Sequence, residues 1–355
     1  MNFLKKLLLG IFLAGSVALA APAQKDVKEW TVYIHMNGDN NLCPYASKNL
    51  KDIESKDVSA VANIIVAFDC NRQGDSKMIT IANGKTTISN KGEYDMGDWQ
   101  FLLANANKAF DQFPSKHRMI DIWNHGAGWK MRAHHITKGI SYDDQSGNHI
   151  TAEQIGYIVD GLKLPVDIMG YDACLMQMVE IAYELDPSKI MYMLGSEETE
   201  PGDGWNYKTM IQELSIKADP VSFGKAMVDG YISQYTNEGV THSFIEMDRV
   251  ADLVVALDGL AKEYISRPDE VKTAMNQTVG YAYADYKDIG NFIKILNPAN
   301  KDELLEKLSA VVVYNKNTMN SDGLSIYLTA NPLESYKDLK FGKQTSWFDM
   351  LAAIK

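Results

Sequence analysis

The sequence predicts an α/β fold in which a mainly parallel sheet carries helices on both faces and a mostly helical subdomain follows at the C-terminus. Short apolar runs rich in β-branched residues recur up to residue 195. Segments with helical periodicity separate these runs, as in repeated strand–helix–strand units. After Pro220, helical patterns dominate. The 355 residues are 46% hydrophobic and 23% charged, which supplies enough apolar material for a large core.

The first domain is expected to span residues 21–215. Its main strands are expected at residues 29–36, 63–69, 119–123, 166–169 and 190–195. Its helices are expected at residues 45–53, about 99–113, 152–161 and 175–185. The Asn83-Gly84 pair predicts a hairpin between strands 78–82 and 86–89. Thr151 suits the N-cap of the helix at 152–161, and residues 140–143 fit a short strand or a loop.

The C-terminal subdomain is expected to span residues 216–355 and to pack on the first domain. Helical patterns cover residues 221–234, 250–265 and 269–283. Strands are expected at residues 243–247 and 323–329. No repeat or low-complexity linker separates this part from the first domain, so the two are expected to form one body.

The first twenty residues have the pattern of a signal peptide. Lys5 and Lys6 precede an apolar stretch at residues 7–19, and small residues at 18 and 20 predict cleavage after Ala20. A retained membrane anchor is disfavoured, because the apolar stretch is shorter than the roughly 20 residues a span requires. The chain is therefore expected to be exported, periplasmic or secreted. The net charge of −11 without a Lys/Arg-rich run disfavours nucleic acid as a partner.

Two reactive side chains follow two of the expected strands. Cys174 stands where the strand at 166–169 gives way to the expected helix at 175–185, and a helix dipole there would favour the thiolate. His125 follows the strand at 119–123 and precedes Gly126 in a glycine-containing turn. Ligands of such sheets bind beyond the carboxyl ends of strands, so both side chains are expected at one edge. His125 and Cys174 are about 50 residues apart, as are the catalytic His and Cys of caspases. Taken alone, however, His125 could be a structural histidine and Cys174 a core cysteine.

The order of several motifs resembles that of the clostripain family of cysteine peptidases, relatives of caspases, legumains and gingipains. The matching blocks are residues 30–42, 94–98, 121–129, 141–144, 171–176 and 197–205, with a looser match at 323–327. The resemblance implies a caspase-like fold and a catalytic dyad of Cys174 and His125. It also supports the backbone N–H groups of Gly126 and Cys174 as donors to the oxyanion of the tetrahedral intermediate.

The resemblance implies cleavage of protein or peptide substrates after Arg or Lys, through an acyl-enzyme. Asp172 lies two residues before the expected nucleophile and would pair with the basic P1 side chain. An alternative for Asp172 is capping of the following helix. Asp203 could add a second charge, and a turn role is equally compatible with its setting. The order of preference between Arg and Lys stays open.

Residues 130–139 form a basic, irregular segment between the two expected catalytic residues. Members of the resembled family are cut between them, so Lys138 is our first choice of self-processing site. A solvated loop is the plain alternative. A metal site at the adjacent His134 and His135 is disfavoured, because neighbouring side chains point apart and no third ligand has suitable spacing.

No cofactor is required for the expected chemistry, but the resemblance allows a calcium requirement. Asp143 and Asp144 are candidate ligands, although no calcium-loop spacing is present. Whether Cys43 and Cys70 pair is open, as is the oligomeric state. Two other functions remain: a non-catalytic binding protein on a caspase-like scaffold, and a cysteine-dependent transpeptidase or ligase using the same dyad.

Overall fold

The computed structural model describes residues 26–129 and 139–354. The expected signal peptide and its cleavage site lie outside these residues, as do Lys138 and all of the expected processing segment except Gly139. Within the described residues, no helix is long and apolar enough to cross a membrane.

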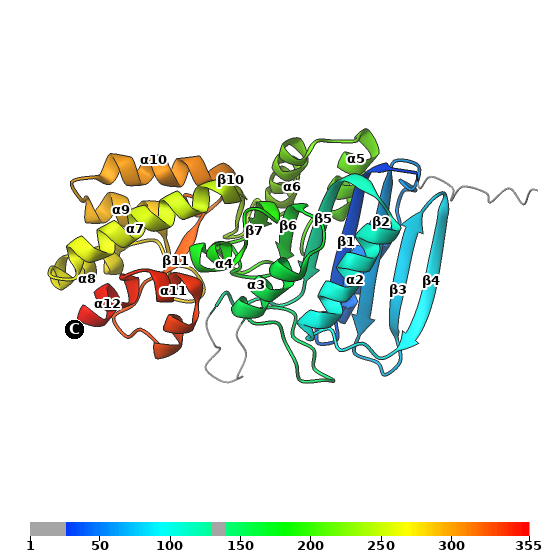
Figure 1. The fold of residues 1–355 in the computed structure, drawn as a ribbon, viewed down its shortest axis with the longest axis horizontal. Coiled ribbons are helices and arrows are strands. Elements are labelled where there is room, and N and C mark those ends of the chain that lie inside the picture. Colours follow the sequence, from blue (N-terminus) through cyan, green and yellow to red (C-terminus); the bar gives the residue numbers. More distant parts are fainter. Residues whose placement is uncertain (1–25, 130–138, 355) are drawn as a thin grey trace, which may run out of the picture.

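A nine-stranded sheet forms the centre of the molecule, with the strand order β10-β8-β7-β6-β5-β1-β2-β3-β4 (Figure 1). Neighbouring strands from β7 through β6, β5 and β1 to β2 are parallel, and the outer strands at both edges are antiparallel. The strands are β1 Lys28–Gly38, β2 Ala62–Cys70, β3 Ser76–Ala82, β4 Lys85–Gly92, β5 Ser115–Trp123, β6 Val166–Asp172, β7 Ile190–Gly195, β8 Thr241–Glu246 and β10 Val312–Asn317. The predicted mainly parallel sheet is confirmed.

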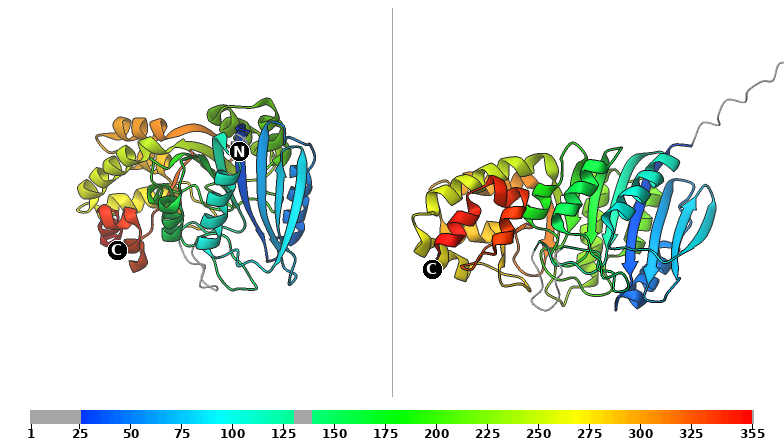
Figure 2. Two further views of the ribbon diagram at one scale, coloured as in Figure 1. Left: turned by 45° about the vertical axis from the view of Figure 1, so that its right-hand side comes forward. Right: turned by 60° about the horizontal axis from the view of Figure 1, so that its bottom comes forward.

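Helices cover both faces of this sheet because its strands are apolar on both sides. One face packs against α2 (Trp99–Gln112), α3 (Ala152–Gly161) and α4 (Val179–Glu184). The other packs against α1 (Cys43–Ile53), α5 (Tyr207–Ile216) and α6 (Pro220–Gln234). Figure 2 shows these layers from two further sides. Alternate strand residues divide between the two cores, as Tyr33 and Val32 of β1 do.

The C-terminal part extends the molecule at the β10 edge of the sheet (Figure 1). Its further elements are α7 Val250–Tyr264, α8 Pro268–Gln277, α9 Ile289–Leu296, α10 Lys301–Val311, α11 Lys340–Gln344 and α12 Trp347–Ala353, with β9 Tyr286–Asp288 and β11 Ser325–Tyr327 forming a small second sheet and 3-10 turns at Met247–Arg249 and Glu334–Asp338. Because β8 and β10 join the central sheet, the sheet continues across the expected boundary at residue 215.

Buried carboxylates fasten this C-terminal part to the sheet layer. The Glu180 carboxylate on α4 accepts hydrogen bonds from the Tyr336 hydroxyl at 2.7 Å and from the Tyr327 N–H at 2.8 Å. The Lys340 N–H donates to Glu184 at 2.7 Å. Since these groups are buried, each lost partner would leave a polar group unsatisfied, so the two parts form one packed body.

The expected helix at residues 175–185 is wrong in its start. Residues 173–178 form a turn and an extended segment, and α4 begins only at Val179. Leu175 adopts a φ of 65°, which no right-handed helix accommodates. Cys174 is therefore not at a helix N-terminus, and the helix-dipole argument for its thiolate does not apply. The expected helix at 269–283 also ends early, at Gln277, where α8 stops.

A disulfide joins Cys43, the first residue of α1, to Cys70, the last residue of β2. This bond settles the pairing that the sequence left open, and Cys174 takes no part in it. Disulfides persist in oxidising compartments, so this bond agrees with the expected export.

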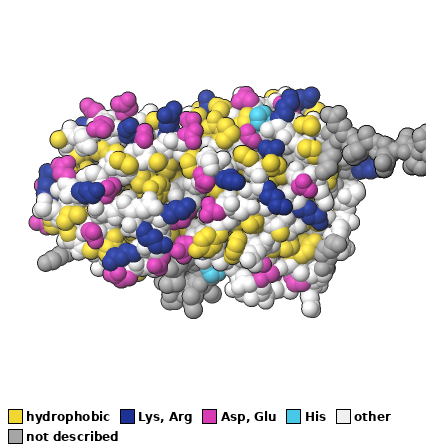
Figure 3. Space-filling model, viewed as in Figure 1, with side chains coloured by type: hydrophobic (Ala, Val, Ile, Leu, Met, Phe, Trp, Pro, Cys, Tyr) yellow, Lys and Arg dark blue, Asp and Glu magenta, His cyan; other side chains and the backbone are white. Residues whose placement is uncertain are grey.

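Acidic and basic side chains are interspersed over the surface shown in Figure 3. This face therefore shows no broad field of one sign, despite the net charge of −11.

Candidate active site

A pocket of about 510 Å³ lies at the carboxyl edge of the parallel strands and contains both predicted catalytic side chains. It is lined by His125, Gly126, Cys174 and neighbours from several loops, namely Asn40, Asn41, Ala127, Tyr142, Asp144, Leu175, Thr199, Ala282 and Tyr283. A second pocket of about 460 Å³ between α2 and the β3–β4 hairpin contains no candidate nucleophile. The pocket around Cys174 is therefore the candidate active site.

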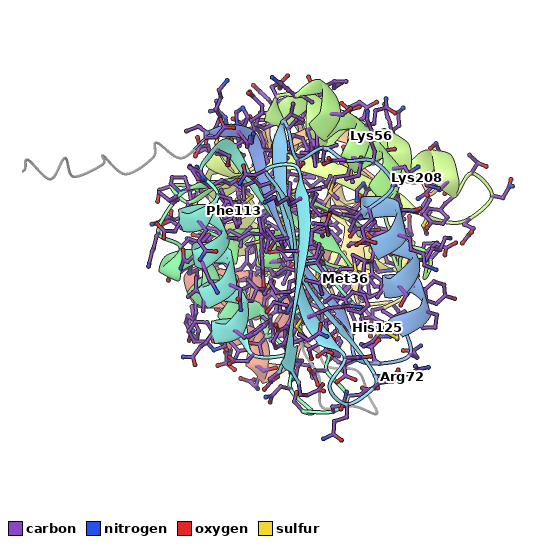
Figure 4. All side chains as sticks on the ribbon, turned by 90° about the vertical axis from the view of Figure 1, so that its right-hand side faces the viewer. Met36, Lys56, Arg72, Phe113, His125 and Lys208 are labelled. Atoms are coloured by element: carbon purple, nitrogen blue, oxygen red, sulfur yellow. A yellow bond between two sulfur atoms is a disulfide. The ribbon has the colours of Figure 1, made fainter. Side chains whose placement is uncertain are left out.

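Strand register brings His125 and Cys174 to the same edge. Trp123 and Asp172 are partners at the ends of the parallel strands β5 and β6, and each reactive residue follows two positions later. The Asn124 N–H donates to the Asp172 carbonyl at 3.2 Å, which continues the pairing one residue beyond the strand. In the edge-on view of Figure 4, His125 and Arg72 lie at one end of the strands, and Lys56 and Phe113 toward the other.

Asn41 orients the half-buried imidazole of His125. The distance between His125 Nε2 and Asn41 Oδ1 is 2.7 Å. An amide oxygen only accepts, so Nε2 carries a proton in this contact and Nδ1 is the nitrogen that can exchange a proton with a nucleophile. Asn41 belongs to the turn after β1, and the sequence did not predict its contact with His125.

The Cys174 thiol is held by the loop that follows β7. The Glu200 N–H donates to Sγ at 3.3 Å, and the Glu200 carbonyl oxygen lies 3.9 Å from Sγ. The Leu175 N–H donates to the Glu198 carbonyl at 3.1 Å, which fixes the turn that carries the cysteine. The sulfur therefore contacts one backbone donor and one backbone acceptor, both from Glu200.

Gly126 packs directly on the backbone of Cys174. A Cβ atom at position 126 would lie 2.3 Å from the Cys174 carbonyl oxygen and 3.2 Å from the Cys174 nitrogen. Within the described residues, the Gly126 N–H donates no hydrogen bond to protein. The absence of a side chain thus lets the two segments, and their two predicted oxyanion donors, approach each other.

Asp172 is buried and is not among the residues that line the pocket. Its carboxylate is buried and accepts hydrogen bonds from the Trp205 N–H at 3.1 Å and the Tyr207 hydroxyl at 3.0 Å. The same hydroxyl lies 2.7 Å from the buried carboxylate of Asp121. Burial raises the pKa of Asp172 to about 6, and the hydrogen bonds partly offset this effect.

Glu200 brings a second acidic group beside Asp172, and no sequence pattern predicted this neighbour. Both its carboxyl oxygens are enclosed, and neither has a hydrogen-bond partner of good geometry among the described residues. Burial, followed by the negative charge of Asp172, raises the pKa of Glu200 well above its ordinary range. Two adjacent buried acids can be neutralised by a shared proton or by a positively charged ligand group.

Three further aspartates were predicted as site residues, namely Asp203 for substrate binding and Asp143 and Asp144 for calcium. Asp203 is half exposed and forms an ion pair of 2.7 Å with Lys48, so it lies outside the pocket. Asp143 is buried and accepts a hydrogen bond from the Met96 N–H at 2.9 Å, whereas Asp144 lines the pocket.

The sequence model of the clostripain family matches residues 32–351. The chain belongs to the clostripain family. Clostripain from Hathewaya histolytica is 23% identical over 178 residues, which cover 46% of this chain. The match spans only 34% of clostripain, so this clostripain-family chain corresponds to about a third of that relative.

Two solved structures share the fold of this clostripain-family chain. A secreted C11 cysteine protease from Bacteroides thetaiotaomicron, in complex with an irreversible peptide inhibitor, has a TM-score of 0.74 at 18% identity and covers 91% of this chain and 99% of its own. An inactive zymogen C11 protease from Parabacteroides distasonis has a TM-score of 0.69 at 18% identity, with the same coverage. At this identity the likeness shows the fold, and it agrees with the predicted caspase-like architecture.

Proposed function

We propose that this clostripain-family chain is an exported cysteine endopeptidase with Cys174 as nucleophile and His125 as the proton-transfer group. The observation that carries the proposal is a pocket that contains both the Cys174 thiol and the His125 imidazole, whose Nε2 is bound by Asn41. The arrangement of nucleophile, base and orienting group is the one that nucleophilic catalysis requires.

The reaction proceeds in two steps. The Cys174 thiolate attacks the scissile carbonyl carbon, and the backbone N–H groups of Gly126 and Cys174 stabilise the oxyanion. His125 gives a proton to the leaving amine, and the acyl-enzyme forms. His125 then takes a proton from water, which attacks the thioester and releases the acid product and the thiolate.

Specificity for Arg or Lys at P1 is the finer part of the proposal. It is supported by the adjacent buried carboxyl groups of Asp172 and Glu200, neither of which forms an ion pair with Lys, Arg or His within the described residues. A guanidinium offers a planar fork that pairs with two carboxylate oxygens, so Arg would gain more than Lys. Asp203 would contribute only after release of its ion pair with Lys48.

Self-processing within residues 130–139, first at Lys138, belongs to the same proposal. The segment connects Trp129, beside the pocket residue Ala127, to Gly139, whose carbonyl accepts a hydrogen bond from the Ala127 N–H at 2.9 Å. A cut there would leave these two ends held by protein contacts. A calcium requirement, with Asp143 and Asp144 as candidate ligands, also remains a proposal.

The experiment uses residues 21–355 and the Cys174→Ala variant, with and without calcium, on matched fluorogenic peptides ending in Arg, Lys, Asp, Asn or Leu. We expect the parent protein, but not the Cys174→Ala variant, to cleave after Arg and Lys. Mass spectrometry of both proteins should show whether only the parent protein is split between His125 and Cys174. Product analysis with an added amine separates hydrolysis from ligation. No cleavage by either form, after processing by an external protease, would favour the binding-protein alternative.

A further inference from the structure

Helix α1 contacts both the strand that leads to His125 and the loop that holds Cys174. Its Asn49 side chain accepts a hydrogen bond from Trp123 Nε1 at 3.0 Å and donates one to the Asp203 carbonyl at 3.0 Å. Trp123 is the last residue of β5, two positions before His125. Asp203 belongs to the loop after β7 that also contacts the Cys174 sulfur. One amide of α1 therefore connects the two segments that carry the proposed dyad.

Two further side chains of α1 contact the same loop. The Tyr45 ring packs so closely on the backbone of Gly202 that a Cβ atom at position 202 would lie 2.8 Å from the ring. Lys48 forms the ion pair of 2.7 Å with Asp203. This ion pair is exposed and contributes little by itself, whereas Asn49 is only 2% exposed and its hydrogen bonds are costly to lose. The Asn49 amide is thus the main connection between the helix and the loop.

A disulfide fixes the start of the same helix. Cys43 begins α1, and its partner Cys70 ends β2. Asn41, which binds the His125 ring at 2.7 Å, lies two residues before Cys43. The turn between them is closed by the Cys43 N–H, which donates to the Asn40 carbonyl at 3.3 Å. The disulfide therefore restrains the residue that orients the imidazole as well as the helix.

We infer that α1 is a positioning element of the active site, with the Cys43–Cys70 disulfide and Asn49 as its two fixed points. The disulfide holds the first residue of the helix, and Asn49 ties its second turn to β5 and to the loop after β7. Through these contacts the helix sets the separation of the imidazole and the thiol, on which proton transfer depends. This inference rests on the proposed function.

A role in stability alone is the alternative, because disulfides and buried hydrogen bonds both stabilise folds. Asn63 provides a matched control. It is 2% exposed, like Asn49, and its side chain donates to the Thr31 hydroxyl at 3.1 Å. Asn63 is the second residue of β2, so it lies at the end of the parallel strands away from the pocket. Asn63→Ala therefore removes a buried amide without altering either fixed point of α1.

The first test is the reactivity of Cys174, which requires no substrate. Residues 21–355 are treated with iodoacetamide between pH 5 and 9 without reductant, and alkylation of Cys174 is followed by mass spectrometry. The proteins compared are the parent, Asn49→Ala, the disulfide-free variant Cys43→Ser/Cys70→Ser, His125→Ala and Asn63→Ala. In Asn49→Ala and the disulfide-free variant, we expect the rate at pH 7 to fall about tenfold, toward that of His125→Ala, because a displaced imidazole no longer supports the thiolate. Asn63→Ala should match the parent.

Hydrogen exchange and kinetics test the connection itself. The amides of residues 199–205 in Asn49→Ala, and those of residues 40–43 in the disulfide-free variant, should exchange at least about tenfold faster than in the parent. The amides of α7 should exchange as in the parent. On one Arg peptide, kcat should fall about tenfold in both variants, with a smaller change in KM. If the disulfide-free variant does not fold, Asn49→Ala and its control Asn63→Ala decide the outcome.

Two results would overturn the inference while the alkylation rates of the parent and His125→Ala still differ. One is a parent-like alkylation profile in both Asn49→Ala and the disulfide-free variant, which would leave α1 with a stabilising role alone. The other is an equal loss in Asn63→Ala, which would make the effect one of stability. If the parent and His125→Ala are alkylated alike, the proposed dyad is wrong, and its positioning by α1 is wrong with it. Failure of the proposed function is therefore distinguishable from failure of this inference alone.

Discussion

A Cβ atom on Gly126 would lie 2.3 Å from the carbonyl oxygen of Cys174, a distance that no real side chain tolerates. The two segments bearing the proposed dyad therefore touch through bare backbone. This contact fixes both the position of His125 and the spacing of the two proposed oxyanion donors.

Gly126→Ala is expected to lower kcat/KM by about 10²-fold or more, because the added Cβ must push the segment away from Cys174 and so displace the residue-126 N–H from the oxyanion, and a lost oxyanion donor costs about that much. The measurement is peptide hydrolysis together with the melting temperature of the variant. Gly259→Ala is the matched control, since a Cβ there meets no atom within 4 Å. Equal activity of the two variants would argue against an oxyanion role for the Gly126 N–H.

Asn41→Ala is expected to reduce kcat by about tenfold or more with little change in KM, because the His125 ring loses the partner that orients it. Asn41→Asp keeps an oxygen acceptor at this position and should recover most of the loss. Steady-state kinetics of the three proteins on one Arg peptide provide the comparison. If Asn41 had a purely structural role, Asn41→Ala would instead lower the yield of folded protein, and kcat would not fall selectively relative to KM.

Asp172→Asn is expected to lower kcat/KM for peptides ending in Arg or Lys by about 10²-fold or more, because the buried P1 charge loses its counter-charge. Cleavage after Leu, however slow, should not fall in parallel. Glu200→Gln should give a smaller loss, and Asp203→Asn tests the exposed carboxylate now paired with Lys48. If Asp203→Asn alone removes the preference for Arg and Lys, the assignment of Asp172 is wrong.

The preference for a cationic P1 group should depend on pH near 6. Burial raises the pKa of Asp172 to about 6, so its carboxyl is neutral below this pH and charged above it. The ratio of kcat/KM for an Arg peptide to that for the neutral citrulline analogue should therefore rise as the pH increases from 5 to 7. Ionisation of Cys174 and His125 affects both substrates equally, so it does not change this ratio. A flat ratio in the parent protein, equal to that of Asp172→Asn, would contradict this account.

The parallel core was predictable because its strands are buried on both faces and read as continuous apolar runs bounded by turns. The start of α4 at Val179, in contrast, was not predictable from the sequence. Leu175, Met176 and Met178 are apolar and buried, yet tertiary contacts keep this segment out of a helix. The Gln177 N–H donates to the Ser196 carbonyl at 3.0 Å, and Met178 pairs with Ser325. Periodicity cannot distinguish such a segment from a buried helix.

The site was predictable to the extent that motifs are local. His125 and Cys174 end strands and carry flanking glycine or aspartate signals, so the sequence placed them at one edge of the sheet. Asn41 is 84 residues from His125, and its contact has no local pattern. Glu200 lies within the block at residues 197–205, which matched the family but did not predict the direction of its side chain. The buried carboxylates of Asp39, Asp69 and Asp143 likewise come together from three segments that are distant in the sequence.

The most direct test of the central claim is covalent labelling by an irreversible peptide inhibitor with Arg at P1. The account predicts one adduct per chain, located at Cys174 by mass spectrometry, with formation slowed by competing Arg peptide and by at least tenfold in His125→Ala. An unlabelled Cys174 in protein that still cleaves the Arg peptide, or equal labelling rates with and without His125, would contradict the proposed dyad.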